Sequence, residues 1–181
     1  MTKSLSLDIK TFLQKDTTKN FLKSAQLFID LLEKKDISKD SFLKQAHIIL
    51  IDLYLKGHQL EQIDLKYSSV DTVIEKSDVK YFKSQNQALV ALLGEEAFYW
   101  EIFDPINDKE EKPVQGWLVD DFVDIYHDLK IELGKIKIGT DEAIEDALWQ
   151  MKWSFLNHWG MHCVSSIRAL HFLCYEGKVV M

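Results

Sequence analysis

Proline and glycine are scarce in this sequence. Its 181 residues include only 2 prolines and 7 glycines. Because these residue types end helices and form tight turns, a chain with so few of them has few positions at which a helix would end or a turn would form. An all-β fold needs turn residues about every 8–12 positions. The scarcity therefore excludes a fold built mainly of short strands and favours long helices.

Cysteine and long apolar runs are also missing. The 2 cysteines, Cys163 and Cys174, fall in one predicted helix, where a separation of 11 residues puts them too far apart for a disulfide. We expect both to be reduced and buried. No apolar run approaches the roughly 18 residues of a membrane span, and residues 1–16 lack the apolar run of a signal peptide. The sequence therefore predicts a cytoplasmic protein without a membrane segment.

Positive charge is in deficit, with 22 Lys and Arg against 29 Asp and Glu and a net charge of −7. Nucleic acids and membrane surfaces are polyanionic, so neither is an expected partner. A chain of this length with 46% hydrophobic residues can bury one core without a disulfide or metal. We therefore predict one domain over residues 1–181, with no cofactor and with residues 1–15 as a loose arm or short helix.

Apolar residues recur at spacings of three and four along most of the chain, which is typical of helices lying on a core. The pattern predicts an all-α, single-domain bundle of six or seven helices. Asp16–Thr18 and Ser38 offer N-caps, and a short connection predicts an antiparallel hairpin over residues 17–57. Gly57 and Gly134 are expected to end helices. The expected helices span residues 17–34, 38–57, 79–94, 95–103, 117–133 and 140–175, with a loop at 58–77.

The longest uninterrupted pattern covers residues 140–175. Two apolar rows run along it, so we predict one long central helix surrounded by neighbours. Glycine inside a helix costs about 1 kcal/mol relative to alanine, so Gly160 should mark a close helix contact or a kink. One row holds Ile144, Leu148, Met151, Phe155, Trp159 and Cys163; the other holds Trp149, Trp153, Leu156, Gly160, Val164 and Ile167.

Several segments resemble an uncharacterised bacterial family. Residues 124–130 read D-I-Y-H-D-L-K, residues 159–160 read W-G, and residues 168–171 read R-A-L-H. Residues 93–96 and 99–103, L-G-E-E and Y-W-E-I-F, are similar to a further segment of the family. The resemblance implies an all-helical cytoplasmic domain and implies no activity.

The likeness covers roughly residues 20–173, with Ala97 and Ile167 departing from the family's pattern. It does not single out His158 or His162. The residues that it does single out are Asp124, Tyr126, Asp128, Lys130, Trp159, Gly160, Arg168 and His171.

Two groups of residues have the spacing of metal ligands. Asp121, Asp124 and Asp128 share one helix face, where Asp124 and Asp128 would bind a divalent ion or pair with cations. His158 and His162 stand four residues apart, which is a ligand geometry for zinc, although imidazoles satisfied near a core share this spacing. The sequence leaves both alternatives open for each group.

Arg168 lies between apolar positions, so a buried guanidinium there would need a partner with matching acceptors. We expect a structural ion pair with Asp124 or Asp128. The alternative is a pocket for a small anion or a partner, built from Tyr126, Lys130, Arg168 and His171.

No complete catalytic set can be assembled from these residues. The sequence therefore favours a noncatalytic interaction or regulatory domain, with a protein or small anion as partner. The alternative is a metal-dependent hydrolase of a phosphorylated small molecule, with Asp124 and Asp128 as metal ligands and with Lys130 and Arg168 holding the phosphate.

Overall fold

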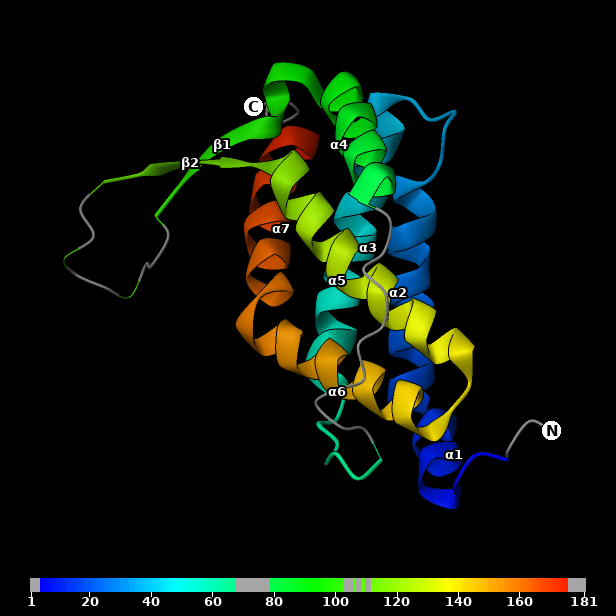
Figure 1. The fold of residues 1–181 in the computed structure, drawn as a ribbon. Helices are drawn as coiled ribbons and strands as arrows, with labels where there is room; N and C mark the ends of the chain where they lie inside the picture. The colour runs from blue at the N-terminus through cyan, green and yellow to red at the C-terminus, as the bar shows by residue number, and fades with distance from the viewer. Residues whose placement is uncertain (1–3, 68–78, 103–105, 107–108, 110–111, 176–181) are drawn as a thin grey trace.

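The computed structural model describes residues 4–67, 79–102, 106, 109 and 112–175. These residues form seven α-helices, a 3₁₀ turn and a two-stranded antiparallel hairpin (Figure 1). The all-α class is confirmed, with the small hairpin as an addition. The elements are α1 (Leu7–Gln14), α2 (Asp16–Leu32), α3 (Lys39–Gln59), α4 (Val79–Leu93), η1 (Gly94–Ala97), β1 (Phe98–Glu101), β2 (Val114–Trp117), α5 (Leu118–Ile138), α6 (Asp141–Asn157) and α7 (Trp159–Tyr175).

The hairpin predicted for residues 17–57 is present as α2 and α3, which lie side by side (Figure 1). Ser38 caps α3 as predicted, because its hydroxyl accepts a hydrogen bond from a backbone N–H of the first turn. Gly57 does not end α3, contrary to the prediction. A Cβ at Gly57 would lie 2.6 Å from the ring of Trp159, so the missing side chain makes room for this aromatic ring.

One large core lies among α2, α3, α5 and α7. The helix α3 packs against both α2 and α7, and α5 packs against α6 and α7. Aromatic rings from different helices meet in this core. Phe122 of α5 makes edge contacts with Phe28 of α2 and Phe42 of α3, while Phe21 of α2 stacks on Trp159 of α7. These contacts fix α7 and α5 relative to the α2–α3 hairpin.

Residues 140–175 form two helices, so the prediction of a single long helix is wrong. The break is at His158, whose φ of −147° and ψ of −88° are not helical. Gly160 shows the physical reason, since a Cβ there would lie only 2.2 Å from the carbonyl oxygen of Phe155. The end of α6 and the start of α7 approach each other too closely for a side chain. We call residues 157–160 the elbow.

The elbow also divides the two predicted apolar rows. Every member of the first row is buried, as predicted. In the second row Trp153, Leu156 and Val164 are exposed, and no described element covers them. Because the chain turns at the elbow, α6 and α7 bury only one side each against the bundle.

The segment expected to form a helix over residues 95–103 is instead η1 followed by β1. Figure 1 shows β1 and β2 as a hairpin that projects from the side of the bundle. Strand pairing stacks the ring of Phe98 on that of Trp117, with centroids 5.7 Å apart. Gly134 also departs from its prediction, because α5 continues through it and ends at Gly139, where φ is +76°.

Leu7–Gln14 form the short helix α1, and a short helix was one of the two alternatives predicted for residues 1–15. Ile9 of α1 is buried with Ile63, Ile144 and Leu148 in a small second cluster. Beside this cluster, Glu145 of α6 is only 1% exposed. Its two carboxylate oxygens accept hydrogen bonds of 2.7 Å from the backbone N–H groups of residues 66 and 67. Glu145 therefore fastens this loop to α6.

A buried ion network joins α5 to α6. The Lys135 ammonium lies 2.9 Å from Glu132 and 2.6 Å from Asp146. Burial raises the pKa of Glu132 to about 7, because loss of hydration outweighs the attraction of Lys135.

This shift predicts that Glu132 makes unfolding depend on pH. The ordinary pKa of a glutamate side chain is 4.5, and the pKa of Glu132 in the fold is about 7. The native state therefore binds this proton more tightly than the unfolded state does. The contribution of Glu132 to the free energy of unfolding is fully present below the lower value. It is lost as the pH rises to the higher one, and the loss is roughly 3 kcal/mol. Denaturant titrations from pH 5 to pH 8 should show that the free energy of unfolding falls more steeply with pH in the wild type than in Glu132→Gln. The exposed control Glu142→Gln should follow the wild type; equal slopes for all three proteins would contradict the assignment.

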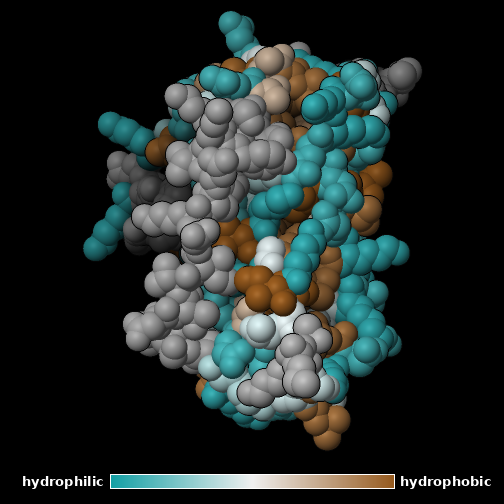
Figure 2. Space-filling model, turned by 45° about the vertical axis from the view of Figure 1, so that its right-hand side comes forward, coloured by the Kyte–Doolittle hydropathy of each residue, from teal (hydrophilic) through white to brown (hydrophobic). Residues whose placement is uncertain are grey.

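Apart from the atoms drawn in grey, the face shown in Figure 2 is mostly hydrophilic, with hydrophobic side chains visible between the hydrophilic ones. Among the described residues, no helix combines the length and the apolar character that crossing a membrane requires.

Candidate metal centre

Three aspartates lie along one face of α5. Asp121, Asp124 and Asp128 follow one another at spacings of three and four, which places them on the same side of a helix. Each carboxylate lies within ion-pairing distance of His158 or His162. The predicted carboxylate row therefore faces the predicted histidine pair across the bundle surface.

The elbow positions both histidines. His158 is the non-helical residue itself, and His162 lies in the first turn of α7. Their ring centroids are 4.9 Å apart with the ring planes at 77°. The side chain of His158 is 45% exposed to solvent, whereas that of His162 is 25% exposed.

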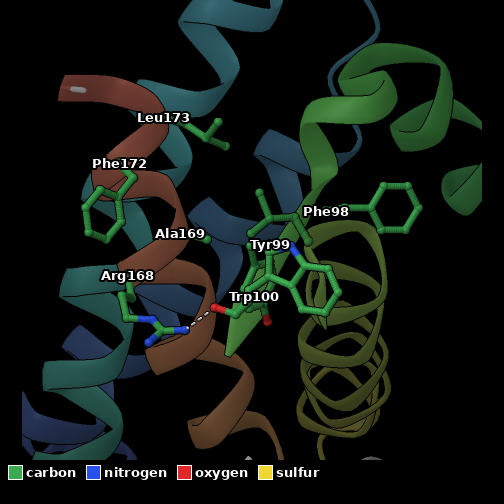
Figure 3. Close-up of a pocket in the computed structure, with 8 residues that line it drawn as sticks. Phe98, Tyr99, Trp100, Arg168, Ala169, Phe172 and Leu173 are labelled. Atoms are coloured by element: carbon green, nitrogen blue, oxygen red, sulfur yellow. Dashed lines mark hydrogen bonds between the residues drawn. The ribbon is translucent and has the colours of Figure 1, made fainter. Parts of the chain in front are cut away.

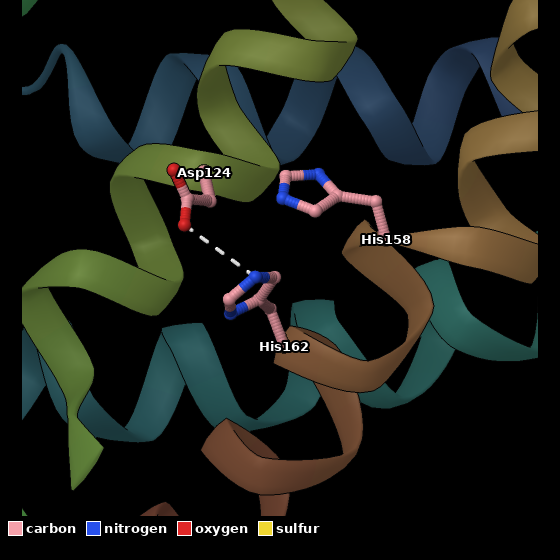
Figure 4. Close-up of side chains that lie close together, drawn as sticks. All are labelled: Asp124, His158 and His162. Atoms are coloured by element: carbon pink, nitrogen blue, oxygen red, sulfur yellow. Dashed lines mark ion pairs between the residues drawn. The ribbon is translucent and has the colours of Figure 1, made fainter.

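Asp124, His158 and His162 direct one donor atom each into a shared space, and these three atoms lie within 4.8 Å of one another. Oδ2 of Asp124 is 3.4 Å from Nε2 of His162. Figure 4 shows the carboxylate arriving from α5 and the two rings from the elbow and α7. We call these three residues the Asp–His cluster.

The other nitrogen of each histidine already contacts a carboxylate. Nδ1 of His162 lies 2.8 Å from Asp121, and Nδ1 of His158 lies 2.8 Å from Asp128. Histidines that bind metals usually donate the second ring N–H to such a partner, which fixes the tautomer and the ring orientation. Nε2 of each ring is therefore the nitrogen left for an ion. Asp121 also accepts a 2.7 Å hydrogen bond from the hydroxyl of Tyr99.

Two protonation equilibria belong to the cluster. The hydrogen bond to Asp121 raises the pKa of His162 above its ordinary value, because it favours the imidazolium. Burial raises the pKa of Asp124, although the neighbouring His162 opposes this shift. A bound cation favours the neutral imidazole and the ionised carboxylate, so metal binding would release protons.

The donor set fits a divalent ion of the zinc type. Zinc binds imidazole nitrogen and carboxylate oxygen, and three protein ligands leave one tetrahedral position open. Donors at bonds of about 2.0–2.1 Å around such an ion are roughly 3.4 Å apart. Asp124 and His162 already have this separation, and the widest pair, at most 4.8 Å apart, would need only side-chain adjustment. Mg²⁺ and Ca²⁺ prefer oxygen ligands alone.

A cavity of about 350 Å³ borders the cluster at His158 and His162. Its walls come from the hairpin, the start of α5 and α7. Glu101, Asp120 and Asp121 supply carboxylates, and the described residues that line it include no lysine or arginine. The lining of this cavity therefore favours a neutral or cationic occupant over an anion.

The chain matches, over residues 13–176, the model of a family described as a domain of unknown function (DUF5063). It belongs to this family. The match confirms the resemblance to an uncharacterised family. Among solved structures the chain is similar to the crystal structure of protein BF1032 from Bacteroides fragilis. That similarity has 24% sequence identity and a TM-score of 0.75 and covers 94% of this chain and 99% of that one, and it shows the fold alone. No curated protein matches the sequence.

In this DUF5063 domain Arg168 does not pair with Asp124 or Asp128, so the predicted structural ion pair is wrong. Arg168 is exposed and donates a 2.8 Å hydrogen bond from Nη2 to the backbone carbonyl oxygen of Trp100. Asp128 instead contacts His158. The physical reason is the elbow, which sets His158 and His162, and not Arg168, against the carboxylate row.

The predicted anion pocket is not assembled either. Tyr126 and Lys130 of α5 both donate hydrogen bonds to Glu33 at the end of α2. His171 makes ring contacts with His47 of α3, and Arg168 contacts β1. The four residues therefore belong to three separate sites.

Tyr99 is a site residue that the sequence analysis missed. Its segment was expected to be helical, whereas β1 places its hydroxyl on Asp121, next to the cluster. The aromatic residues between two Gly- or Pro-containing segments were the available signal for a strand.

Proposed function

We propose that this domain binds one divalent transition-metal ion of the zinc type at Asp124, His158 and His162, and that the ion serves a noncatalytic, regulatory role. The carrying observation is the geometry of the Asp–His cluster, whose three donor atoms lie within 4.8 Å of one another. An ion at this point joins α5 to the elbow. Since the donors come together only in the folded chain, binding stabilises the native state.

The surroundings of the cluster support regulation over catalysis. Asp121 and Asp128, the carboxylates next to the ligands, already bind the two histidines, so neither is available as a general base. The net charge of −7 favours a protein partner over a nucleic acid or a membrane surface. Both cysteines are free and buried, in keeping with the reducing cytoplasm, where we place the domain.

The hydrolase alternative has less support. Of its two expected metal ligands, Asp124 lies in the cluster while Asp128 orients a histidine. Its two phosphate-binding cations, Lys130 and Arg168, bind a carboxylate at the end of α2 and a backbone carbonyl of β1. Among the described residues that line the cavity beside the cluster there is no lysine or arginine to hold a phosphate.

Metal titration tests the proposal. We expect Zn²⁺ and Co²⁺ to bind with one-to-one stoichiometry in calorimetry, and Mg²⁺ not to bind. At a free ion concentration about 100 times Kd, stability should rise by about 2.7 kcal/mol, which is roughly 5–10 °C in Tm. His162→Ala and His158→Ala should each abolish this shift. Asp121→Asn and Asp128→Asn, which only orient the histidines, should weaken binding about 10–100-fold.

His58→Ala is the matched control, because His58 is an exposed histidine of α3 outside the cluster. It should bind metal like the wild type. Unchanged Zn²⁺ binding in the His158→Ala/His162→Ala double variant would refute the site. Absence of binding in the wild type would leave the cluster as two histidine–carboxylate pairs and would refute the proposed function.

A further inference from the structure

A second pocket lies between β1 and α7, away from the Asp–His cluster. It has a volume of about 290 Å³. Figure 3 shows Arg168, Phe172 and Leu173 on the α7 side and Trp100 on the β1 side, with Ala169 between them. This volume is at the lower end of the ~300–1,000 Å³ of small-molecule sites, so the pocket suits a small ligand and not a folded partner.

The pocket has one cationic group. Arg168 is the single arginine of the chain, and it is the only lysine or arginine among the described residues that line this pocket. The hydrogen bond from Nη2 to the Trp100 carbonyl holds the guanidinium at the edge of the pocket. A guanidinium presents five N–H donors in a planar fork, so one bond to the carbonyl leaves donors for a second acceptor. The fork matches a carboxylate.

The other residues that line the pocket are mostly apolar, and several of them are exposed. The side chains of Phe172 and Trp100 are 53% and 67% exposed, and Leu173 is also exposed. Beneath them Leu118 and Ala169 are buried and form an apolar floor. The rings of Phe98 and Trp100 both extend from β1 away from α7, as the alternation of side chains along a strand requires, so neither ring fills the pocket (Figure 3). A hydrocarbon group placed here would cover this apolar floor.

We propose that this pocket binds a small apolar carboxylate, with the carboxylate on Arg168 and the hydrocarbon chain on the apolar floor of Leu118 and Ala169 beside Phe172. One guanidinium matches one carboxylate, whereas a phosphate monoester carries more negative charge than this site balances. The walls reward a hydrocarbon chain, because burial of apolar surface stabilises a complex in proportion to its area. The ligand class follows from the combination of a single cation with an apolar floor. The pocket is separate from the proposed metal site and does not depend on it.

Decanoate is a suitable probe, and decanol is its uncharged counterpart. Binding is measured by calorimetry in the presence of EDTA, so the result does not depend on the metal proposal. We expect decanoate to bind more tightly than decanol. Arg168→Gln should weaken decanoate binding at least about tenfold, the size of a charge-assisted hydrogen bond, without changing decanol binding. Phe172→Ala should weaken binding of both probes.

Lys19→Gln provides the charge-matched control, because it removes one positive charge from an exposed site on α2. It should leave decanoate affinity unchanged. Thermal denaturation of each variant confirms that it is folded before binding is compared. Equal decanoate affinity in the wild type and Arg168→Gln would overturn the proposal, as would decanoate binding no better than decanol in the wild type.

Discussion

Replacing Gly160 with alanine is expected to destabilise the protein by about 3 kcal/mol, which is roughly 6–12 °C in Tm. Alanine normally stabilises a helix by about 1 kcal/mol relative to glycine. At Gly160 the added Cβ would lie 2.2 Å from the carbonyl oxygen of Phe155, which is a backbone atom and cannot rotate away. The elbow must open to accept the methyl group, and this movement weakens the packing of α7 on α3.

Gly134→Ala is the matched control for this substitution. Gly134 also lies inside a helix, but a Cβ there would meet no atom within 4 Å. The control should therefore stabilise the protein by up to about 1 kcal/mol. Denaturant unfolding of both variants gives the comparison. A Gly160→Ala protein as stable as the wild type would show that the elbow is not held by this contact.

Replacing Glu145 with alanine should have an effect of similar size, about 3–5 kcal/mol. The carboxylate is almost fully buried, and each oxygen accepts a 2.7 Å bond from a backbone N–H of the loop at residues 66 and 67. Hydrogen bonds to a charged group contribute about 1.5–3 kcal/mol each. Alanine removes both acceptors together. The loop then loses its attachment to α6.

Hydrogen exchange gives a local measurement for this variant, since the amides of residues 66 and 67 should lose protection while those in the core of α3 keep it. Glu142→Ala, in the exposed first turn of the same helix, should cost under about 1 kcal/mol. If the two amides exchanged at the same rate in the wild type and in Glu145→Ala, the carboxylate would not be what holds the loop.

The helical framework could be predicted from the sequence because its signals are local. Ser38 caps α3 through a residue three positions away, and the spacing of apolar residues placed the whole first row of residues 140–175 in the core. Such features depend on a few neighbouring residues. The break at His158 was only one of the two alternatives that Gly160 left open, because a glycine is compatible with either a straight or a bent helix until Phe155 is placed.

The sequence indicated the aspartates and the histidines of the candidate metal centre as two separate groups. The spacings of Asp124 and Asp128 and of His158 and His162 each suggested ligands, but no local pattern joins α5 to the two histidines across 30 to 41 residues. Arg168 illustrates the opposite error. Its partner is a backbone carbonyl, and every residue offers one, so side-chain types gave no indication of it.

Tyr99 has a position that connects two parts of the molecule. Its side chain lines the pocket between β1 and α7, and its hydroxyl binds Asp121, which in turn holds His162. Ligands at two linked sites obey thermodynamic reciprocity. If an occupant beside Tyr99 changes the affinity of His162 for an ion by some factor, the ion must change the affinity of that occupant by the same factor. The path between the two sites runs through one phenol and one carboxylate. Through it, an occupant of the pocket beside β1 would bind the ion-bound and the ion-free protein with different affinities.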